Sequence, residues 1–120
     1  MDAQDLVEQW TALWNGDLSL AERLLTDDFQ IHFGGVDEAS KAGDSVRGPG
    51  QMAAYVDEFR AARPGLLFEV ETAPVQDEGG MAFRWRASRD GVERSGIDLL
   101  RLDDSRIAEA WSVMGGRRFP

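Results

Sequence analysis

The first apolar residues of the chain recur at the spacing of one helix face. Four positions carry this pattern: Leu6, Trp10, Leu13 and Trp14. Residues three and four apart share a side of an α-helix, so the spacing predicts an amphipathic helix. Asp2 suits the position before its first turn, and Asn15-Gly16 supplies a stop. We therefore expect the chain to open with a helix that carries two tryptophans.

Residues 17–29 predict a second, short helix that leads into a strand. Its apolar positions lie on one helix face: Leu20, Leu24 and Leu25. The segment FQIHF, residues 29–33, then alternates apolar and polar side chains, which is typical of a strand. The following run, residues 34–50, is rich in Gly, Ser and Asp and indicates a mobile loop with room for a short strand at 45–47.

A third helix is predicted over residues 49–65. Pro49 suits its first turn, and Pro64-Gly65 ends it. One face of this helix is apolar and comprises Met52, Tyr55, Val56 and Phe59. The helix thus has a side that can pack against a sheet.

The rest of the chain is predicted to be strand. Four segments have the composition of strands, at residues 66–75, 81–88, 92–102 and 106–114. The turn signals QDEGG, RDG and DDS separate them, and such short connections make neighbouring strands antiparallel. Helices followed by strands predict an α+β fold, with helices on one face of a curved sheet. At 120 residues, the chain is expected to form a single domain, residues 1–120.

Alternation separates the two faces of the predicted sheet. In MAFRWRAS the apolar side comprises Met81, Phe83, Trp85 and Ala87, and the arginines lie opposite. The strand 92–102 is apolar on both sides, with Leu100 on one face and Ile97 and Leu99 on the other. A strand covered on both sides suggests a partner beneath the sheet, so we expect a homodimer through its outer face. A monomer with scattered exposed aliphatic residues is the alternative.

Asp98 shares a face of this strand with Leu100 and Leu102. A carboxylate among apolar side chains costs free energy unless it is neutral, paired or functional. In one interpretation, apolar surroundings raise its pKa, and the acid donates a hydrogen bond or transfers a proton. In the other, Arg94, Arg101 or a backbone amide satisfies it and its role is structural.

Composition argues against several classes of protein. The net charge of −9 disfavours a nucleic-acid ligand, because such binders need a basic surface. With no cysteine and only His32, thiol nucleophiles, disulfides and multi-histidine metal centres are excluded within one chain. No apolar run has the length of a membrane span, and the acidic start does not resemble a signal peptide. We expect a cytoplasmic protein without a metal or a cofactor.

The chain resembles the superfamily of cone-shaped α+β barrels that includes nuclear transport factor 2, ketosteroid isomerase and the SnoaL-type polyketide cyclases. The segments WTALWNGDLSLAERLLTDDFQIHF and GIDLLRLDDSRIAEAWSV carry the resemblance, which covers essentially the whole chain. It implies a curved, mostly antiparallel sheet wrapped around three helices of the N-terminal half. It further implies an internal pocket and dimers formed through the outer face of the sheet.

The known chemistries of this superfamily do not carry over intact. Ketosteroid isomerases use an Asp base and an oxyanion hole made of a Tyr and a protonated Asp. By resemblance, the Asp of the hole falls on Asp98, the Tyr on Trp10 and the base on Phe33. The acid/base Asp of the cyclases falls near Met114, and that of the related epoxide hydrolases near Ser112. Each chemistry thus lacks an essential group.

Two residues remain as candidates for catalysis. Asp98 is the candidate acid, and His32 is the natural base because its unperturbed pKa is near neutral. However, the alternation in FQIHF turns His32 away from the pocket if Phe29, Ile31 and Phe33 face inward. The expected ligand-binding residues are Trp10, Phe33, Tyr55, Phe83, Trp85, Leu100, Ser112 and Met114. Trp14 is assigned to the core, and Trp111 to the outer face of the sheet.

Two functions remain open. The chain is either an enzyme that performs cofactor-free isomerisation, cyclisation or dehydration on a small apolar molecule, or a module that binds such a molecule, or serves as a dimeric scaffold, without turnover. The missing base and phenol favour binding, whereas the buried Asp98 favours catalysis. The sequence does not decide whether the protein is an enzyme.

Overall fold

A computed structural model describes residues 2–120 of the chain. The first half contains the helices α1 (Ala3–Trp14), η1 (Leu18–Leu20), α2 (Ala21–Leu24), α3 (Glu38–Ala42), η2 (Gly43–Ser45) and α4 (Gly48–Ala61), together with strand β1 (Leu25–Phe33). The second half contains strands β2 (Leu67–Val70), β3 (Val75–Gln76), β4 (Gly80–Arg89), β5 (Val92–Asp103) and β6 (Arg106–Met114). The predicted α+β fold is confirmed.

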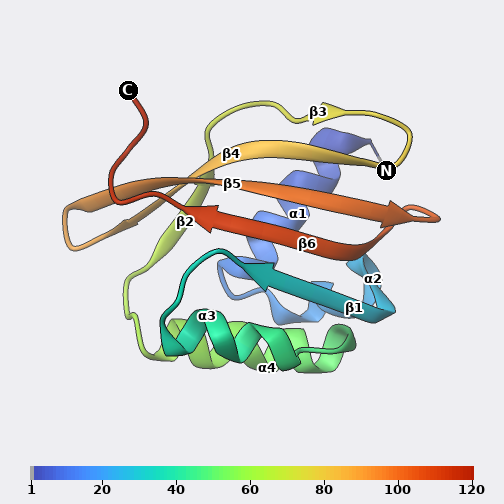
Figure 1. Ribbon diagram of the computed structural model, residues 1–120, viewed down its shortest axis with the longest axis horizontal. Helices are drawn as coiled ribbons and strands as arrows, with labels where there is room; N and C mark the ends of the chain where they lie inside the picture. The colour runs from blue at the N-terminus through green and yellow to red at the C-terminus, as the bar shows by residue number, and fades with distance from the viewer. Residues whose placement is uncertain (1) are drawn as a thin grey trace.

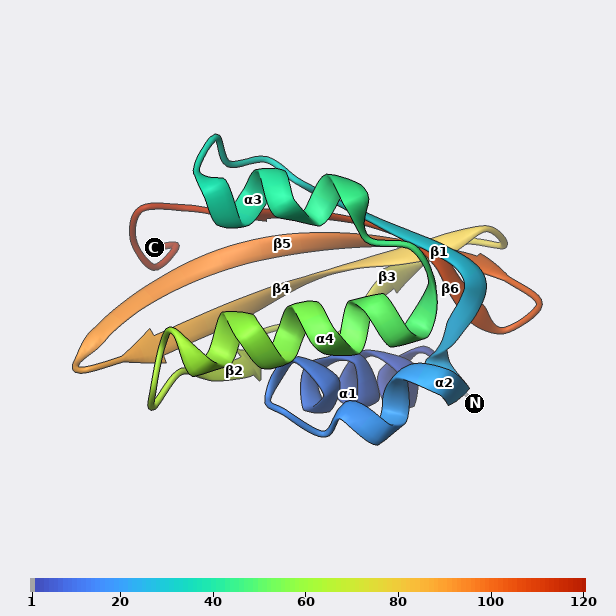
Figure 2. The same ribbon diagram turned by 90° about the horizontal axis from the view of Figure 1, so that it is seen from below.

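The strands form one curved, mixed sheet in the order β1-β6-β5-β4-β2, and β3 also pairs with β4. All neighbours are antiparallel except β1 and β6, which run parallel. In Figure 1, α1 lies behind the sheet, and α3 and α4 lie beyond its β1 edge. Figure 2 shows α1 and α4 together on one side of the long strands β4 and β5. The helices α1 and α4 therefore cover the concave face of the sheet, whereas α3 lies on the other side of these strands in this view.

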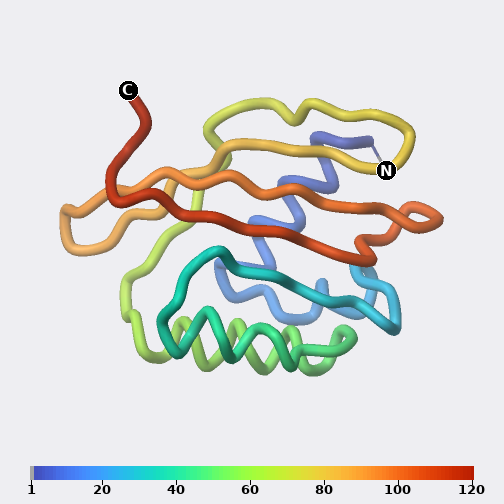
Figure 3. Tube along the Cα trace, viewed as in Figure 1, coloured from blue at the N-terminus to red at the C-terminus, as the bar shows by residue number. Residues whose placement is uncertain are grey.

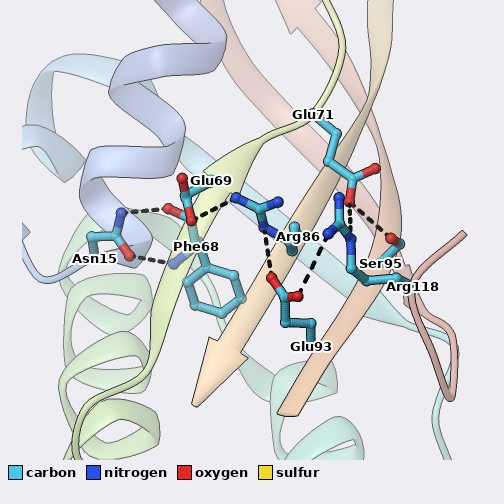
Figure 4. Close-up of polar contacts among 8 residues, drawn as sticks. All are labelled: Asn15, Phe68, Glu69, Glu71, Arg86, Glu93, Ser95 and Arg118. Carbon is cyan, nitrogen blue, oxygen red and sulfur yellow. Dashed lines mark hydrogen bonds and ion pairs between the residues drawn. The ribbon is translucent and has the colours of Figure 1, made fainter. Parts of the chain in front are cut away.

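Sequence-local contacts fix the start of α1, and a contact with β2 fixes its end. The Asp2 carboxylate accepts a hydrogen bond from the Asp5 amide at 2.8 Å, which is the predicted N-cap. At the other end, the Asn15 side chain donates to Phe68 O and accepts from Phe68 N, both at 2.8 Å (Figure 4). The Asn15 side chain therefore joins the end of α1 to β2 and fixes the position of this end of the helix on the sheet.

The structure corrects three details of the predicted elements. The segment 34–50 holds the short helices α3 and η2 instead of a strand at 45–47, and Asp37 caps α3 by accepting from the Ser40 amide. Strand β1 begins at Leu25, inside the segment predicted as helix, because the buried Leu25 already pairs with Ile107 of β6. The predicted strand 66–75 divides into β2 and β3, which pair separately with β4.

The last residues of the chain fold back over the outer face of the sheet. The path of the trace in Figure 3 shows this tail leaving β6 and turning beside the start of β5. Ser95 N donates to Arg117 O, Phe119 N donates to Ser95 Oγ, and Ser95 is fully buried as a result. Arg118 lies 3.5 Å from Glu93 and 3.9 Å from Glu71 (Figure 4). The tail thus covers one end of the outer face.

No helix in the described part of the chain is both long and apolar enough to cross a membrane.

Candidate functional site

Asp98 is held by two tryptophan side chains. Trp10 Nε1, from α1, donates to Asp98 Oδ2 at 2.9 Å, and Trp85 Nε1, from β4, donates to Asp98 Oδ1 at 2.8 Å. All three side chains are buried, with 4% of Asp98, 1% of Trp10 and 7% of Trp85 exposed. An indole N–H only donates, so each of the two carboxyl oxygens accepts a hydrogen bond from one indole. One acid therefore joins the helix layer to the sheet.

The pKa of Asp98 is raised above its ordinary value because burial removes water from the carboxylate. Hydrogen bonds from Ser112, Trp10 and Trp85 oppose this effect without cancelling it. Within residues 2–120, no Arg or Lys forms an ion pair or hydrogen bond with Asp98. The structural interpretation in which Arg94, Arg101 or a backbone amide satisfies this acid is therefore wrong; its partners are the two indoles and the Ser112 hydroxyl.

Gly96 makes room for the indole that reaches Asp98. Gly96 and Trp85 face each other on neighbouring strands, and a Cβ at position 96 would overlap the Trp85 ring. Any larger residue would therefore push the indole away from the sheet. The sequence Gly96-Ile97-Asp98 thus provides both the space for the ring and the acceptor for its N–H.

A cavity of about 640 Å³ opens between the sheet and the helices beside this acid. Its volume is in the range of small-molecule sites. The apolar and aromatic lining includes Trp14, Phe33, Tyr55, Phe59, Leu66, Phe68, Trp85, Ala87 and Met114. The polar lining includes Asp37, Ser40, Arg63, Ser88, Arg89, Asp90, Arg94 and Ser112. The lining is thus aromatic with a few charged and hydroxyl groups.

Asp98 lies one layer behind the cavity wall. It is absent from the lining, but two residues that contact it, Trp85 and Ser112, belong to the lining. Ser112 faces Asp98 across the β5–β6 pair and is only 9% exposed. A molecule in the cavity therefore meets the Ser112 hydroxyl and the Trp85 ring, and reaches the carboxyl group only through them.

Trp14 is the centre of the aromatic wall. Its ring packs edge-on against five others, with centroid distances of 5.6 to 6.2 Å: Trp10, Phe33, Tyr55, Phe59 and Phe68. Edge-to-face packing of this kind fixes ring orientation. The Tyr55 hydroxyl donates to Ala39 O at 2.6 Å, and burial raises the pKa of Tyr55 to about 12. The only phenol of the chain therefore ties α4 to α3 as a neutral donor.

The residues expected to bind a ligand separate into two groups. Phe33, Tyr55, Trp85, Ser112 and Met114 line the cavity. Trp10, Phe83 and Leu100 do not; they lie in the core with exposed fractions of 3% or less. They pack behind the wall because α1 and the centre of the sheet meet there.

His32 and Asp98 are not brought together. His32 lies on the outer face of the sheet, where its Nε2 is 2.7 Å from Glu109 Oε2 and its ring stacks on Trp111. This hydrogen bond lowers the pKa of Glu109. The alternation of FQIHF anticipated this side, since Phe29 and Ile31 are buried in the core. His32 therefore has no access to the cavity.

Several lining residues were not expected from the sequence. Trp14 and Phe59 lie on the apolar faces of their helices, a pattern that predicts burial in the core. The same pattern would arise whether or not a cavity opens beside these rings, so it could not identify them as lining residues. Arg94 could have been found, because it shares the inner face of β5 with Asp98 at an even spacing. Within residues 2–120, no three His, Cys, Asp or Glu side chains converge as a set that could hold a metal ion.

Comparison with known proteins identifies related sequences and folds. A family model described as SnoaL-like domain matches residues 6–110. No curated protein matches the chain. Among solved structures, "a putative isomerase of the SnoaL-like family" from Agrobacterium tumefaciens superposes with a TM-score of 0.80 at 19% identity, covering 95% of this chain and 97% of the other.

Two further structures are similar. A SnoaL-like protein of unknown function from Burkholderia thailandensis has a TM-score of 0.74 at 26% identity, with 95% of each chain covered. A SnoaL-like polyketide cyclase from Agrobacterium tumefaciens has a TM-score of 0.71 at 16% identity, covering 97% of this chain and 94% of the other. Identities this low establish the shared fold alone.

Replacing the acid by its amide should destabilise the chain. In the variant Asp98→Asn, the amide oxygen can accept from one indole, but the NH₂ group cannot accept from the other. The substitution should therefore leave one buried N–H unsatisfied and lower the free energy of unfolding by about 1–3 kcal/mol at low pH. This loss should shrink as pH rises. Folding raises the pKa of Asp98 above 3.8. The contribution of Asp98 to folding stability is therefore complete below pH 3.8, and it is lost as the pH rises through the folded-state pKa.

Urea unfolding of both proteins from about pH 4 to pH 8 measures this difference. Asp57→Asn, at an exposed position of α4, is the matched control and should change little. In the double mutant Asp98→Asn/Trp10→Phe, the loss should be smaller than the sum of the two single losses, because the orphaned donor is gone. A loss that grows with pH, or strictly additive losses, would contradict the two-indole arrangement.

Proposed function

The chain belongs to the SnoaL-like domain family, and from this premise we propose that it binds a flat, mostly apolar small molecule in the cavity between sheet and helices. The single observation that carries the proposal is the cavity of about 640 Å³, lined by rings from helices and strands. Flat aromatic surfaces favour flat ligands through stacking and apolar contact.

The rigidity of the wall supports this proposal. Trp85 is fixed on three sides, by Asp98 at its N–H, by Gly96 beneath its ring and by Phe68 edge-on at 5.6 Å. A wall whose rings are already oriented loses little conformational entropy when a ligand binds. Ser112, Ser88 and Ser40 supply hydroxyl groups that can orient polar atoms of the ligand.

Filling part of the cavity should weaken binding without unfolding the chain. Ala87 lines the cavity and is 7% exposed, so Ala87→Leu places three more carbon atoms in the ligand's space. With anthracene-2-carboxamide as a neutral probe, we expect the Kd of Ala87→Leu to rise about tenfold or more. Titration calorimetry gives the Kd, and circular dichroism checks the fold.

The matched control is Ala61→Leu, the same substitution at an exposed position at the end of α4. It should leave the Kd of the probe unchanged. Equal affinities of both variants, or no saturable binding to the unmodified protein, would contradict the proposed site.

Proton transfer to and from the bound molecule is a second candidate function. It is favoured by one observation: the uncompensated acid Asp98 lies directly behind the Ser112 hydroxyl, which faces the cavity. Similar structures named as an isomerase and a polyketide cyclase are consistent with such chemistry. In this scheme Ser112 accepts a proton from a C–H beside a carbonyl while its own proton passes to the Asp98 carboxylate. The reverse transfer returns a proton to carbon.

Hydrogen exchange at carbon tests this second candidate. With 2-tetralone as a probe in D₂O, deuterium should enter beside the carbonyl faster than in buffer. Asp98→Asn and Ser112→Ala should each slow this protein-dependent rate by about a hundredfold, while the Kd of 2-tetralone stays within about tenfold. Exchange is followed by NMR. No protein-dependent exchange, or equal rates in all variants, would leave binding as the function.

The outer face of the sheet supports a second proposal, a homodimer. Four apolar side chains form a block on β5 and β6, in which Ile97 faces Val113 and Leu99 faces Trp111. They are 40%, 53%, 48% and 38% exposed respectively. Arg101, Glu109 and His32 border the block, so both signs of charge lie at its rim. A two-fold axis through the block would bury the apolar side chains against their copies and bring opposite charges together.

A charge within this block should separate the dimer. Leu99→Glu would place two carboxylates in the buried contact, so sedimentation should report the mass of one chain instead of two. Val75→Glu, at an exposed position on β3, is the control and should keep the dimer mass. The same sedimentation for Leu99→Glu and the unmodified protein would contradict an interface on this face.

A further inference from the structure

One arginine of the cavity has no partner among residues 2–120. Three arginines line the cavity: Arg63, Arg89 and Arg94. Arg63 donates to Phe59 O at 3.0 Å and lies 3.8 Å above the Phe59 ring, and Arg89 donates to Pro64 O at 3.0 Å. Arg94 alone forms neither a side-chain hydrogen bond nor an ion pair with any residue of the described chain.

The two acids of the lining do not neutralise Arg94. The Asp37 carboxylate accepts from the Ser40 amide as the cap of α3, and its charge interacts with Arg63. Asp90 is in the β4–β5 turn and lies 3.8 Å from Arg89. In a chain with a net charge of −9, this leaves a local cationic group at the mouth of an aromatic cavity.

The backbone directs Arg94 along the concave face. Arg94, Gly96 and Asp98 are every second residue of β5 and therefore lie on the same side of the strand, and Arg94 pairs with Ala87 of β4. The small Ala87 side chain leaves the space beside it open to the cavity. Asp98 lies four residue steps along the strand from Arg94, which corresponds to roughly 13 Å. Ser112, which pairs with Asp98, therefore lies toward one end of the cavity and the Arg94 guanidinium toward the other, with Trp85 between them.

From this arrangement we infer that the ligand is an aromatic or polycyclic acid, whose carboxylate binds Arg94 at the mouth while its rings lie against Trp85. The inference rests on the binding function proposed above and adds the charge of the ligand. A guanidinium presents two parallel N–H groups that match a carboxylate, and it remains charged at every physiological pH. The ligand thus enters with its apolar end first.

A matched pair of probes tests the inference. Anthracene-2-carboxylate and anthracene-2-carboxamide have the same rings and nearly the same size but differ in charge. The unmodified protein should bind the acid about tenfold more tightly than the amide in low salt. Arg94→Gln should remove this preference by weakening the acid alone, with the Kd of the amide unchanged. Calorimetry gives each Kd, and added salt should reduce the preference.

Arg106→Gln is the control, since it removes the same charge from an exposed arginine outside the cavity lining. It should keep the preference for the acid. Equal binding of acid and amide by the unmodified protein, or a preference that survives Arg94→Gln, overturns the inference about charge while the cavity remains a binding site. Binding of neither probe overturns the proposed binding function and this inference with it.

Discussion

The arrangement of the site depends on one carboxyl group that accepts hydrogen bonds from two indoles. Trp10 is on the first helix and Trp85 on a central strand, so the two bonds to Asp98 fix the helix layer against the sheet. Each bond restrains a large ring that would otherwise turn about its side-chain bonds. The packing of Trp14 and Phe29 against Trp10 follows from that restraint. The shape of the cavity wall is thus set by a polar contact inside an apolar core.

Burying the Asp98 carboxyl group costs free energy, and neighbouring residues reduce this cost. Burial of a lone carboxylate is unfavourable, and here no described cation offsets it. Two N–H donors and the Ser112 hydroxyl replace part of the lost hydration, and Gly96 allows the donor ring to approach. The two indole bonds let this carboxyl group hold a helix and a strand in place. Under the proton-transfer proposal, exchange with the cavity would pass through the Ser112 hydroxyl, because Ser112 and not Asp98 lines the cavity.

Alternation along the strands predicted the faces of the sheet but not the partners of the side chains. It placed Asp98 with Leu100 inside and His32 with Trp111 outside, because a period of two follows directly from strand geometry. It could not find the bond between Trp10 and Asp98, which joins residues 88 positions apart. The parallel pairing of β1 with β6 and the short helix α3 also depend on contacts distant in sequence. The family resemblance predicted the general cone, whereas the cavity lining depends on contacts between segments that are distant in sequence.

Strand β5 shows how one sequence can serve two surfaces. Its even positions run from Arg94 through Gly96 and Asp98 to Leu100, and they pass from the cavity mouth to the core. Its odd positions pass from Ser95, covered by the C-terminal tail, to the exposed Ile97 and Leu99. A shift of the strand by one residue would exchange these sets, exposing Asp98 and placing Ile97 in the core. The hydrogen bonds that hold Asp98 therefore act together with the buried Leu100 to favour the observed register, and through it the exposure of the outer apolar block.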